Sequence, residues 1–415
     1  MIVVLSLLRP RLENALHTRG QRILALIPEG AVGERDTSPG YPVRTIAHWD
    51  DYNELLVLAT EFEAMGVTAV ATIDEPCIRA AAFLRETLDL PGQNLASAVA
   101  CTDKSVMKRR LSAAGIPVAE HRVVASVAEI GDFLAEVGGD IVVKPRHGFG
   151  TINTHRVTAG NFEQLVAAGA FEGSRDLPDY LCSTNISAAV GRVSVIAEKR
   201  IDIAAEYHCE LLLHEGTEVH CLPGRYSSPM LGGSSMGSVL LDENSVEGAA
   251  VRELTRAAAA ALGVTHGFGH CEIFRDSAGR WLVGEFASRP GGLLIPRMLE
   301  LNLGIDNLAL LCDQLAGRQP AAQPGMRSDT VVAWRAISVV GSGVITAIPS
   351  RAQLLSLPGV IDAEIVARPG TPTTDLHGAA VHAAYILVAD ETSDAAEKAA
   401  ERAERLCRIV VEPAA

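Results

Sequence analysis

The amino-acid sequence predicts a fold that begins as α/β and continues as α+β, and three patterns support this prediction. In the first part of the chain, short apolar runs alternate with helical patterns, which is typical of a parallel sheet covered by helices. In the middle of the chain, strand-like runs flank short polar turns, as they do in β-hairpins. The last part contains further strands and an amphipathic helix rich in Ala and Glu.

The length of 415 residues is enough for about two to four structural units, and changes in pattern suggest where they begin. We expect an N-terminal α/β domain at residues 1–95, a small lobe at 96–185, a large lobe at 186–330 and a C-terminal α+β domain at 331–415. Near the last boundary, residues 319–325 have the Pro and Gly content of a linker.

Composition and charge argue against several classes of protein. Hydrophobic residues make up 48% and charged residues 21%, which indicates a globular protein rather than a disordered chain. A formal net charge of −14 argues against a nucleic acid or an anionic membrane as partner. The apolar runs are too short to span a bilayer, and the first residues lack a basic leader and a cleavage site, so they predict a strand rather than a signal peptide. The eight cysteines form no CxxC pair, which is typical of reduced thiols in the cytoplasm.

The N-terminal domain is predicted from five elements. Strands are expected at residues 2–8, 22–27 and 67–73, and helices at 53–65 and 78–88. No GxGxxG motif follows the first strand, so the sequence gives no support for a dinucleotide site there.

The predicted small lobe combines a helix, a strand and a Gly-containing loop. The helix is expected at residues 105–114, directly after Lys104. A strand at 141–145 carries Lys144 and leads into the loop at 146–155. Backbone N–H groups and an ammonium can converge on one phosphate in such an arrangement. An ordinary β-turn with a surface lysine gives the same pattern.

Lysine is rare in this chain. Only five of its 36 basic residues are lysines, namely Lys104, Lys108, Lys144, Lys199 and Lys398. A compact ammonium and a planar guanidinium are not interchangeable, so a chain that prefers arginine has a chemical reason for the lysines it keeps. Lys104, Lys144 and Lys199 lie in segments that other patterns also single out.

Strands outnumber helices in the predicted large lobe and C-terminal domain. In the large lobe we expect strands at 193–199, 206–214 and 218–222, a connector at 201–205, a Gly/Ser-rich loop at 232–237, and helices at 245–262, 295–301 and 307–316. In the C-terminal domain we expect strands at 331–340, 363–367 and 383–388 and a helix at 393–408.

The segment from His270 to Gly292 predicts a β-hairpin around a polar turn at residues 276–279. Pairing around this turn places Glu272 and Glu285 opposite or diagonal to each other on one face. Two carboxylates about 5 Å apart repel by about 3 kcal/mol at an effective dielectric near 20. A hard cation such as Mg²⁺ would relieve this repulsion and could share its coordination with nucleotide phosphates. The alternative is an exposed hairpin with scattered acids.

These motifs together resemble the ATP-grasp superfamily, and within it the carboxylate–amine ligases such as the L-amino-acid (dipeptide) ligases. The resemblance covers almost the whole chain and implies an ATP-grasp fold with a two-lobed ATP clamp. The matching positions are an Asp-Lys pair before a helix (Asp103 and Lys104), a lysine at a strand end (Lys144), a Gly-rich loop (Gly148–Thr154), an adenine hinge (Glu198–Ile201), a ribose-binding acid (Glu206) and a metal pair followed by Arg and Gly (His270, Glu272, Glu285, Arg289 and Gly292).

The resemblance also implies a role for each matching residue. ATP would be bound by Lys104, Lys144, Gly148, Gly150, Thr151, Glu198, Lys199, Ile201, Glu206 and Arg289, and Mg²⁺ or Mn²⁺ by Glu272 and Glu285. Lys104, Lys144 and Arg289 would also act in catalysis. Substrate contacts are expected at Arg225, His270, Ser234, Ser235, Gly291 and Gly292. A surface ion pair for Arg225 and a core position for His270 are the alternatives.

The sequence departs from the family pattern at three places. Ala287 stands where the family often has an Asn metal ligand, and water can replace that ligand on Mg²⁺. Asn153 stands in place of a later Gly of the loop, and Asn reaches left-handed backbone geometry more easily than most residues. The segment Leu231–Gly237 is neutral where the ligases often offer Glu and His to their substrates.

What the resemblance implies is a two-step ligation of small-molecule substrates. A carboxylate would attack the γ-phosphate of ATP to give an acyl phosphate, and an amine would then displace phosphate to form an amide. A homodimer is expected, because similar ligases commonly pair through the N-terminal domain. The alternatives are a carboxylation-type ATP-grasp chemistry and a nucleotide-binding module without catalysis.

Overall fold

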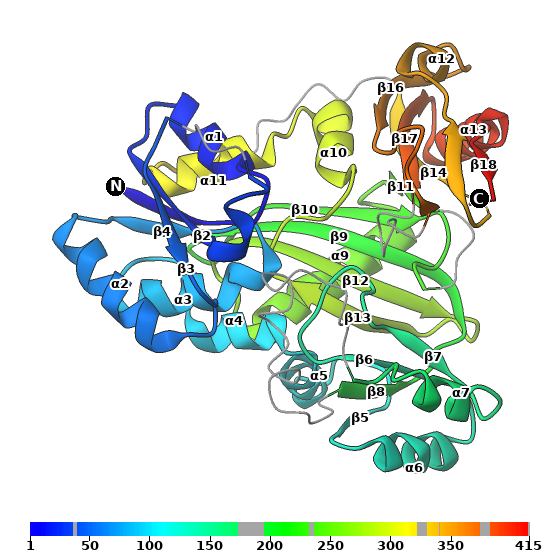
Figure 1. The fold of residues 1–415 in the computed structure, drawn as a ribbon, viewed down its shortest axis with the longest axis horizontal. Helices are drawn as coiled ribbons and strands as arrows, with labels where there is room; N and C mark the ends of the chain where they lie inside the picture. Colours follow the sequence, from blue (N-terminus) through cyan, green and yellow to red (C-terminus); the bar gives the residue numbers. More distant parts are fainter. Residues whose placement is uncertain are drawn as a thin grey trace.

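The computed structural model describes residues 1–35, 40–172, 195–231, 236–321, 330–339, 341–373 and 382–413. In these ranges the strands form four sheets, and Figure 1 shows how they are arranged. The parallel sheet lies at the N-terminal side, a long antiparallel sheet crosses the centre, and a small antiparallel sheet lies apart from both (Figure 1). No helix of these ranges is both long and apolar enough to cross a lipid bilayer.

The first sheet is parallel, as the alternation of strands and helices predicted. Its strand order is β3 (Val43–Ile46), β2 (Ile23–Pro28), β1 (Ile2–Leu5) and β4 (Ala69–Ala71). Helices α2 (Tyr52–Ala64) and α3 (Ile78–Thr87) pack on one face, and α1 (Arg11–Thr18) packs on the other with α11 (Asn307–Leu315) of the distant large lobe. The expected strands and helices of this region are therefore confirmed, although β1 and β4 are shorter than predicted and β3 and α1 were not predicted.

The small lobe is an antiparallel sheet with the order β5 (His121–Val124), β8 (Val195–Lys199), β6 (Ile141–Pro145) and β7 (His155–Val157). Helices α6 (Val127–Val137) and α7 (Phe162–Ala167) accompany it. The expected large lobe began at residue 186, but β8 pairs with β5 and β6 and so belongs to the small-lobe sheet. An apolar strand gives no sign in its sequence of which sheet it will join.

The long sheet has eight strands and extends from the predicted large lobe into the predicted C-terminal domain. Its order is β13 (Trp281–Ala287), β12 (Gly267–Asp276), β9 (Ile203–His214), β10 (Thr217–Tyr226), β11 (Gly237–Leu240), β14 (Val331–Ser338), β17 (His382–Asp390) and β16 (Val360–Ile365). Pairing of β11 with β14 joins the two parts, so the sheet is continuous across the expected boundary at 330. The connector expected at 201–205 is partly strand, because β9 pairs with β12 as far back as Ile203.

Helices cover the long sheet and connect its strands. They are α4 (Leu95–Thr102), α5 (Lys104–Ala113), α9 (Val246–Leu262), α10 (Ile295–Leu303), α12 (Arg351–Leu355) and α13 (Ser393–Leu406), and the strands β15 (Val344–Ala347) and β18 (Val410–Glu412) form the fourth sheet. Local signals explain where α9 begins and ends. Ser245 accepts a hydrogen bond from Gly248 N at its start, and Gly263 adopts φ 73° at its end.

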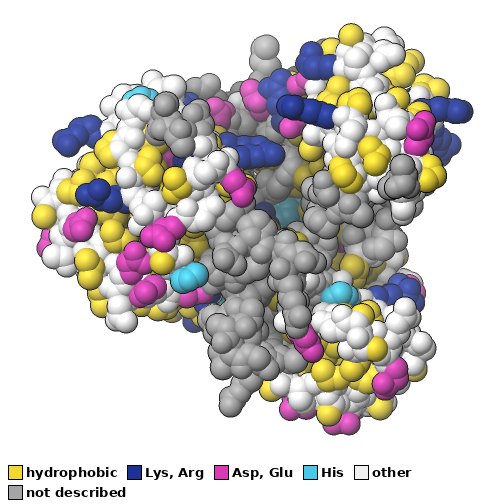
Figure 2. Space-filling model, viewed as in Figure 1, with side chains coloured by type: hydrophobic (Ala, Val, Ile, Leu, Met, Phe, Trp, Pro, Cys, Tyr) yellow, Lys and Arg dark blue, Asp and Glu magenta, His cyan; other side chains and the backbone are white. Residues whose placement is uncertain are grey.

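The three parts of the molecule leave a hollow between them. In the space-filling view, lobes at the left, upper right and lower right surround a recessed centre (Figure 2). The cavity described below lies where the carboxyl ends of β1 and β4, the small lobe and the long sheet meet. The carboxyl edge of a parallel sheet is the common ligand position in α/β proteins.

Candidate active site

A cavity of about 880 Å³ brings together most of the residues that the sequence singled out. It is lined by the N-terminal domain, the small-lobe loop and the long sheet. The predicted residues on its wall are Lys104, Lys144, Gly148, Gly150, Thr151, Glu198, Lys199, Ile201, Glu206, His270, Glu272, Glu285, Arg289, Gly291 and Gly292. A pocket of this size can hold a nucleotide-sized ligand.

Glu272 and Glu285 are direct partners across β12 and β13, as the hairpin pattern predicted. Each carboxylate has a cationic or imidazole neighbour in addition. Lys104 Nζ lies 3.0 Å from Glu285 Oε1, and His270 Nε2 lies 3.7 Å from Glu272 Oε1. Burial opposes ionisation of Glu272, but His270, Lys144 and Arg289 outweigh it and lower its pKa. Both groups therefore present negative charge to the cavity.

The start of α5 positions Lys104. Asp103 is the N-cap of this helix, where its carboxylate accepts hydrogen bonds from the backbone N–H of Ser105 and Val106. The same carboxylate is paired with Arg146. Burial opposes ionisation of Asp103, but hydrogen bonds from Arg146 and Ser105 outweigh it and hold its pKa at about 2. With the helix start fixed, Lys104 Nζ donates to Gly148 O at 2.6 Å and so contacts the Gly-rich loop.

Glu198 lies between Lys108, which is buried, and Lys144, which is partly exposed. Its carboxylate is 3.0 Å from Lys144 Nζ and 3.2 Å from Lys108 Nζ. Burial opposes ionisation of Glu198, but the two lysines outweigh it and lower its pKa to about 2. Burial lowers the pKa of Lys108, whereas the nearby carboxylates raise that of Lys144 despite its burial. The group has one more positive than negative charge, which suits a site for an anion.

Arg289 is attached to the N-terminal domain. Its Nε donates to Glu75 Oε2 at 2.8 Å, and its Nη1 donates to Pro290 O at 3.0 Å. Burial opposes the charge on Arg289, but Glu75 outweighs it and raises its pKa. The guanidinium thus lies at the junction of the N-terminal domain with the segment that follows β13.

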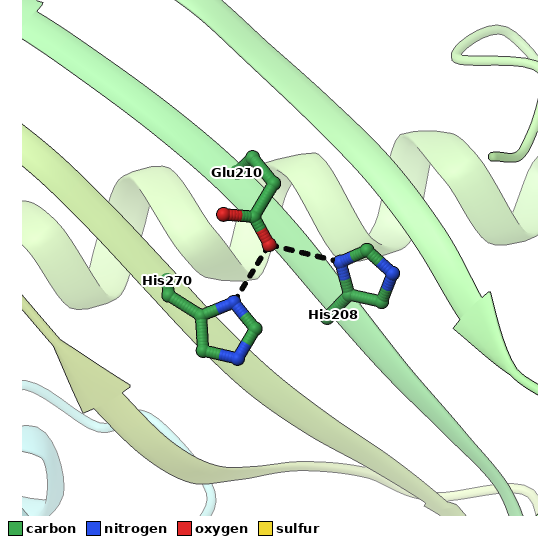
Figure 3. Close-up of side chains that lie close together, drawn as sticks. All are labelled: His208, Glu210 and His270. Carbon is green, nitrogen blue, oxygen red and sulfur yellow. Dashed lines mark hydrogen bonds and ion pairs between the residues drawn. The ribbon is translucent and has the colours of Figure 1, made fainter. Parts of the chain in front are cut away.

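The Glu210 carboxylate contacts two histidines, as Figure 3 shows, and it also contacts the glycine segment after β13. Its Oε1 lies 2.6 Å from His270 Nδ1 and 3.0 Å from His208 Nδ1, and its Oε2 accepts from Gly291 N at 2.8 Å. Burial lowers the pKa of His270, but Glu210 outweighs it and raises that pKa to about 9. Glu210 therefore fixes both the ring of His270 and the backbone of Gly291.

Two further groups of predicted residues line the cavity. Glu206 is buried and accepts a hydrogen bond from Met230 N at 2.8 Å. Burial and the neighbouring Glu272 raise its pKa to about 8. In the Gly-rich loop, Gly150, Thr151 and Asn153 all have positive φ, at 61°, 61° and 55°. The left-handed geometry expected at Asn153 is thus confirmed.

Two clusters have the ligand types of a metal site. Glu272 and Glu285 offer carboxylate oxygens that face one cavity with room for water and phosphate oxygens, and this donor set fits Mg²⁺. The ligand atoms of His208, Glu210 and His270 also lie within 4.8 Å of one another. In that second cluster, however, the Glu210 oxygen already accepts from both imidazoles, and His208 Nε2 lies 2.5 Å from Ser238 Oγ. We therefore interpret the second cluster as a hydrogen-bond network rather than as a metal site.

The structure does not bring every predicted substrate residue to the cavity. Arg225 is absent from its wall, because its guanidinium is held by Asp394 at 2.9 Å and Glu397 at 2.7 Å. The ion-pair alternative for Arg225 is the one that the structure supports. Ser234 and Ser235 lie outside the described residues.

Sequence reasoning missed several residues that hold the site in place. Lys108, Glu75, His208, Glu210 and Tyr226 were given no role, yet each contacts a residue of the cavity wall. Lys108 had a usable signal, since it is one of five lysines and lies four residues after Lys104 on the same helix. The others are partners across long sequence separations and had no such signal.

Comparisons with known proteins show what this chain is similar to. A family model described as L-amino acid ligase C-terminal domain 2 matches residues 335–412. The chain is 31% identical over 273 residues to an L-arginine-specific L-amino acid ligase of Bacillus subtilis, which covers 62% of this chain and 63% of that protein. It is 24% identical over 322 residues to an uncharacterised protein of Sinorhizobium fredii, which covers 76% of this chain and 62% of that protein. The chain thus spans slightly less than two thirds of the length of both relatives.

Solved structures show the same fold along the whole chain. The structure superposes on an L-amino acid ligase of Bacillus licheniformis with a TM-score of 0.75 and 19% identity, covering 99% of this chain and 98% of that one. An N5-carboxyaminoimidazole ribonucleotide synthetase of Thermotoga maritima gives a TM-score of 0.66 and 15% identity, covering 99% of both chains. The chain therefore has the ATP-grasp fold, which confirms the predicted fold class. In sequence it is similar to an L-amino acid ligase, and its residues 335–412 match the model of that family's C-terminal domain 2.

Proposed function

We propose that this protein is an ATP-dependent, ADP-forming ligase that joins a carboxylate to an amine, with amino acids or peptides as substrates. The observation that carries the proposal is the cavity of about 880 Å³, in which Lys104, Lys144 and Arg289 lie with the paired acids Glu272 and Glu285. Phosphoryl transfer requires positioning and neutralisation of charge more than a protein nucleophile. This set of side chains supplies both.

In the proposed reaction, a substrate carboxylate oxygen attacks the γ-phosphorus of ATP and ADP leaves. Lys104 and Lys144 hold phosphate oxygens, and Arg289 holds the group in transfer. Glu75 supports this role for Arg289 because its hydrogen bond of 2.8 Å fixes the direction of the guanidinium. Glu198 does the same for Lys144, from a carboxylate that is itself held by Lys108.

We assign Glu272 and Glu285 to a divalent cation, with Mg²⁺ as the first choice and Mn²⁺ as the second. When bound, the cation would neutralise phosphate charge next to the two carboxylates. His270 supports the assignment of Glu272, because its Nδ1 is fixed by Glu210 and its Nε2 faces the Glu272 carboxylate at 3.7 Å. An imidazole held in this way orients a ligating carboxylate.

In the second proposed step, the amine attacks the acyl carbon and phosphate leaves. An acyl phosphate is readily hydrolysed, so the site has to exclude water. The loop from Gly148 to Thr154 is suited to this role because it lines the cavity and is joined to α5 by the Lys104–Gly148 contact. The left-handed residues of the loop keep its backbone close to the cavity without a long side chain at Gly150.

The substrate class is proposed from the relatives and from charge. One relative is named an L-arginine-specific L-amino acid ligase, so L-arginine is the first amino acid to test. The cavity wall also carries Asp74 and Glu364, besides Glu75, which is paired with Arg289, and these two acids suit a substrate that bears a positive charge. The cavity wall carries Arg9 and Arg11 as well, and these arginines suit a substrate carboxylate.

The decisive experiment measures ADP and phosphate release from ATP with amino acids supplied singly and in pairs. Release that requires both an acid and an amine, together with an amide product detected by mass spectrometry, is the expected result. ATP binding without ADP release would identify a nucleotide-binding module instead. Release that depends on bicarbonate would identify carboxylation chemistry.

We further propose a homodimer that works in the cytoplasm. Pairing through the N-terminal domain is the arrangement to test, by light scattering of the full chain. A mass near 43.8 kDa, that of one chain, would exclude the dimer. Fractionation of the producing cells tests the location.

A further inference from the structure

A second cavity of about 740 Å³ lies behind the candidate active site. Its wall is formed by the amino ends of β1 and β4, the loop after α3, the β9–β10 turn, the start of β12 and the end of α11. Among the described residues, the two cavities share no lining residue. They do adjoin at two places along the chain, since Thr72 and Ser288 line the second cavity and the residues that follow them, Ile73 and Arg289, line the first.

Arg85 is the unusual feature of this second cavity. The side chain of Arg85 lies on the cavity wall, and the residue is only 8% exposed. Its Nε donates to Gln93 O at 3.1 Å and its Nη1 donates to Val70 O at 2.9 Å. A guanidinium has five N–H donors, so these two bonds leave donors for a further acceptor.

No carboxylate in the described part of the chain forms an ion pair with Arg85. The other buried arginines do have such partners: Arg35 pairs with Glu13, Arg79 with Asp50 and Arg335 with Glu404. Taking an ion out of water costs about several kcal/mol unless an opposite charge accompanies it. Burial alone accordingly lowers the pKa of Arg85 to about 10, with no acid acting against it.

Among the described residues, two imidazoles and one acid share the cavity wall with Arg85. His214 and His266 line the same cavity, with their ring centroids 6.4 Å apart. Burial lowers the pKa of His266, and the nearby His214 and Arg85 lower it further, against an opposing effect of Glu215. Glu215 is the acidic residue on this wall, and it is exposed at the turn between β9 and β10.

The glycine at position 92 leaves room for the Arg85 side chain. Gly92 has φ +134°, and a Cβ atom there would lie 2.7 Å from Arg85 Cδ. A larger residue at position 92 would therefore displace the arginine. The loop after α3 lies against Arg85 from Cδ to Nε, and its Gln93 O accepts the Nε hydrogen bond.

We propose that this second cavity binds a small anionic molecule, whose carboxylate or phosphate group is held by Arg85. The ligand supplies the negative charge for Arg85, the one buried arginine that has no carboxylate partner in the described part of the chain. Gln21 on the same wall offers an amide group for the polar remainder of the molecule, whereas the amides of Gln93 and Gln314 already donate to Ser97 Oγ and Leu213 O. The site is separate from the proposed ATP site and does not depend on the proposed reaction.

The test is thermal unfolding of the full chain in sodium succinate and in sodium phosphate, each compared with sodium chloride at equal ionic strength. Four variants accompany the wild type. Arg85→Gln removes the charge, Ala316→Trp fills the cavity from the end of α11, Ala316→Ser is the control for that position, and Lys144→Met weakens the first cavity instead.

We expect at least one of the two anions to raise Tm in the wild type, in Ala316→Ser and in Lys144→Met, with the same midpoint concentration. In Arg85→Gln and Ala316→Trp the midpoint should be at least tenfold higher. A response to succinate alone identifies a carboxylate ligand, and a response to phosphate alone identifies a phosphate ligand. If Arg85→Gln does not fold, Ala316→Trp decides, because it leaves Arg85 in place.

Three results would overturn the proposal. The first is that neither anion raises the Tm of the wild type more than chloride does. The second is that Arg85→Gln and Ala316→Trp both have the same midpoint concentration as the wild type. The third is that the anions no longer raise the Tm of Lys144→Met, which would assign the binding to the first cavity.

Discussion

Lys104 and Glu285 form an ion pair of 3.0 Å that joins the start of α5 to the β12–β13 hairpin. The same ammonium donates to Gly148 O at 2.6 Å. One side chain thus connects a helix, the predicted metal-binding hairpin and the Gly-rich loop. This arrangement suggests that Lys104 has two roles. It fixes the distance between the lobes, and it contributes positive charge to the cavity.

Lys104→Met and Lys144→Met should each lower turnover at least about tenfold, which corresponds to about 1.4 kcal/mol of barrier. The reason is that both ammonium groups line the cavity where phosphate is proposed to bind. Steady-state ADP release measures the effect. Lys398→Met, at an exposed position of α13, is the matched control and should keep wild-type kinetics. Unchanged rates in both cavity variants would refute the nucleotide assignment.

Asp103→Asn should lower the free energy of unfolding at neutral pH by about 1–2 kcal/mol, because Asn loses the charged partner of Arg146. The pKa of Asp103 is about 2 in the folded protein, below its usual value. Its stabilising contribution is therefore present above the unfolded pKa, near 3.9, and is lost as pH falls through the folded pKa. Urea unfolding between neutral and acid pH measures this dependence.

The same series in the Asn variant tests the cause. The difference in stability between wild type and Asp103→Asn should shrink as the pH approaches 2. A difference that stays constant over this range would show that the carboxylate charge is not responsible.

Glu210→Gln should destabilise the fold by about 3 kcal/mol or more, since it leaves the charged partner His270 without its carboxylate. Chemical denaturation gives this value. Glu218→Gln changes an acid whose partners, Arg256 and Arg252, are more exposed, and it should cost less than about 1 kcal/mol. Equal losses in the two variants would argue against a special role for the buried group.

The parts of the fold that depend on local pattern could be predicted from the sequence. The facing positions of Glu272 and Glu285 follow from a single hairpin, so the turn at residues 276–279 was enough to place them. The start of α5 and the left-handed backbone at Asn153 were likewise local.

The parts that depend on distant partners could not be predicted. Glu75 meets Arg289 only because the N-terminal domain packs against the end of β13. β8 joins the small lobe rather than the long sheet, and β11 joins β14, through backbone pairing that any apolar strand allows. Side-chain type signals that a charge needs a partner, but it does not say which partner lies within reach.

Ala287→Asn illustrates this limit. The usual family Asn suggested that this change would tighten metal binding if the pocket had room. In the structure Ala287 is 2% exposed and is not on the cavity wall. It lies opposite His270 in the pairing of β13 with β12. An amide at this buried position would lack space and partners, so we expect a loss of stability of about 1–3 kcal/mol and no gain in metal affinity. Metal-dependent nucleotide binding, measured by calorimetry beside thermal unfolding, checks both parts.

The last prediction treats Glu272, Glu285 and Arg289 as one unit. Because the two acids face each other and the cavity, Glu285→Gln should still bind nucleotide but turn over very slowly. Part of that loss should be recovered at higher Mg²⁺ concentration, since one carboxylate and water remain as ligands. Arg289→Ala should keep metal-dependent nucleotide binding but lose most acid-dependent ADP formation.

Glu75→Gln is the control for Arg289→Ala, because it removes the anchor at 2.8 Å and leaves the guanidinium in place. It should reduce turnover less than Arg289→Ala does. Similar losses in both would mean that Arg289 acts only by joining the N-terminal domain to β13. Full activity of Glu285→Gln at low Mg²⁺ would mean that the two acids form only a polar face of the hairpin, and the proposed metal site would then be wrong.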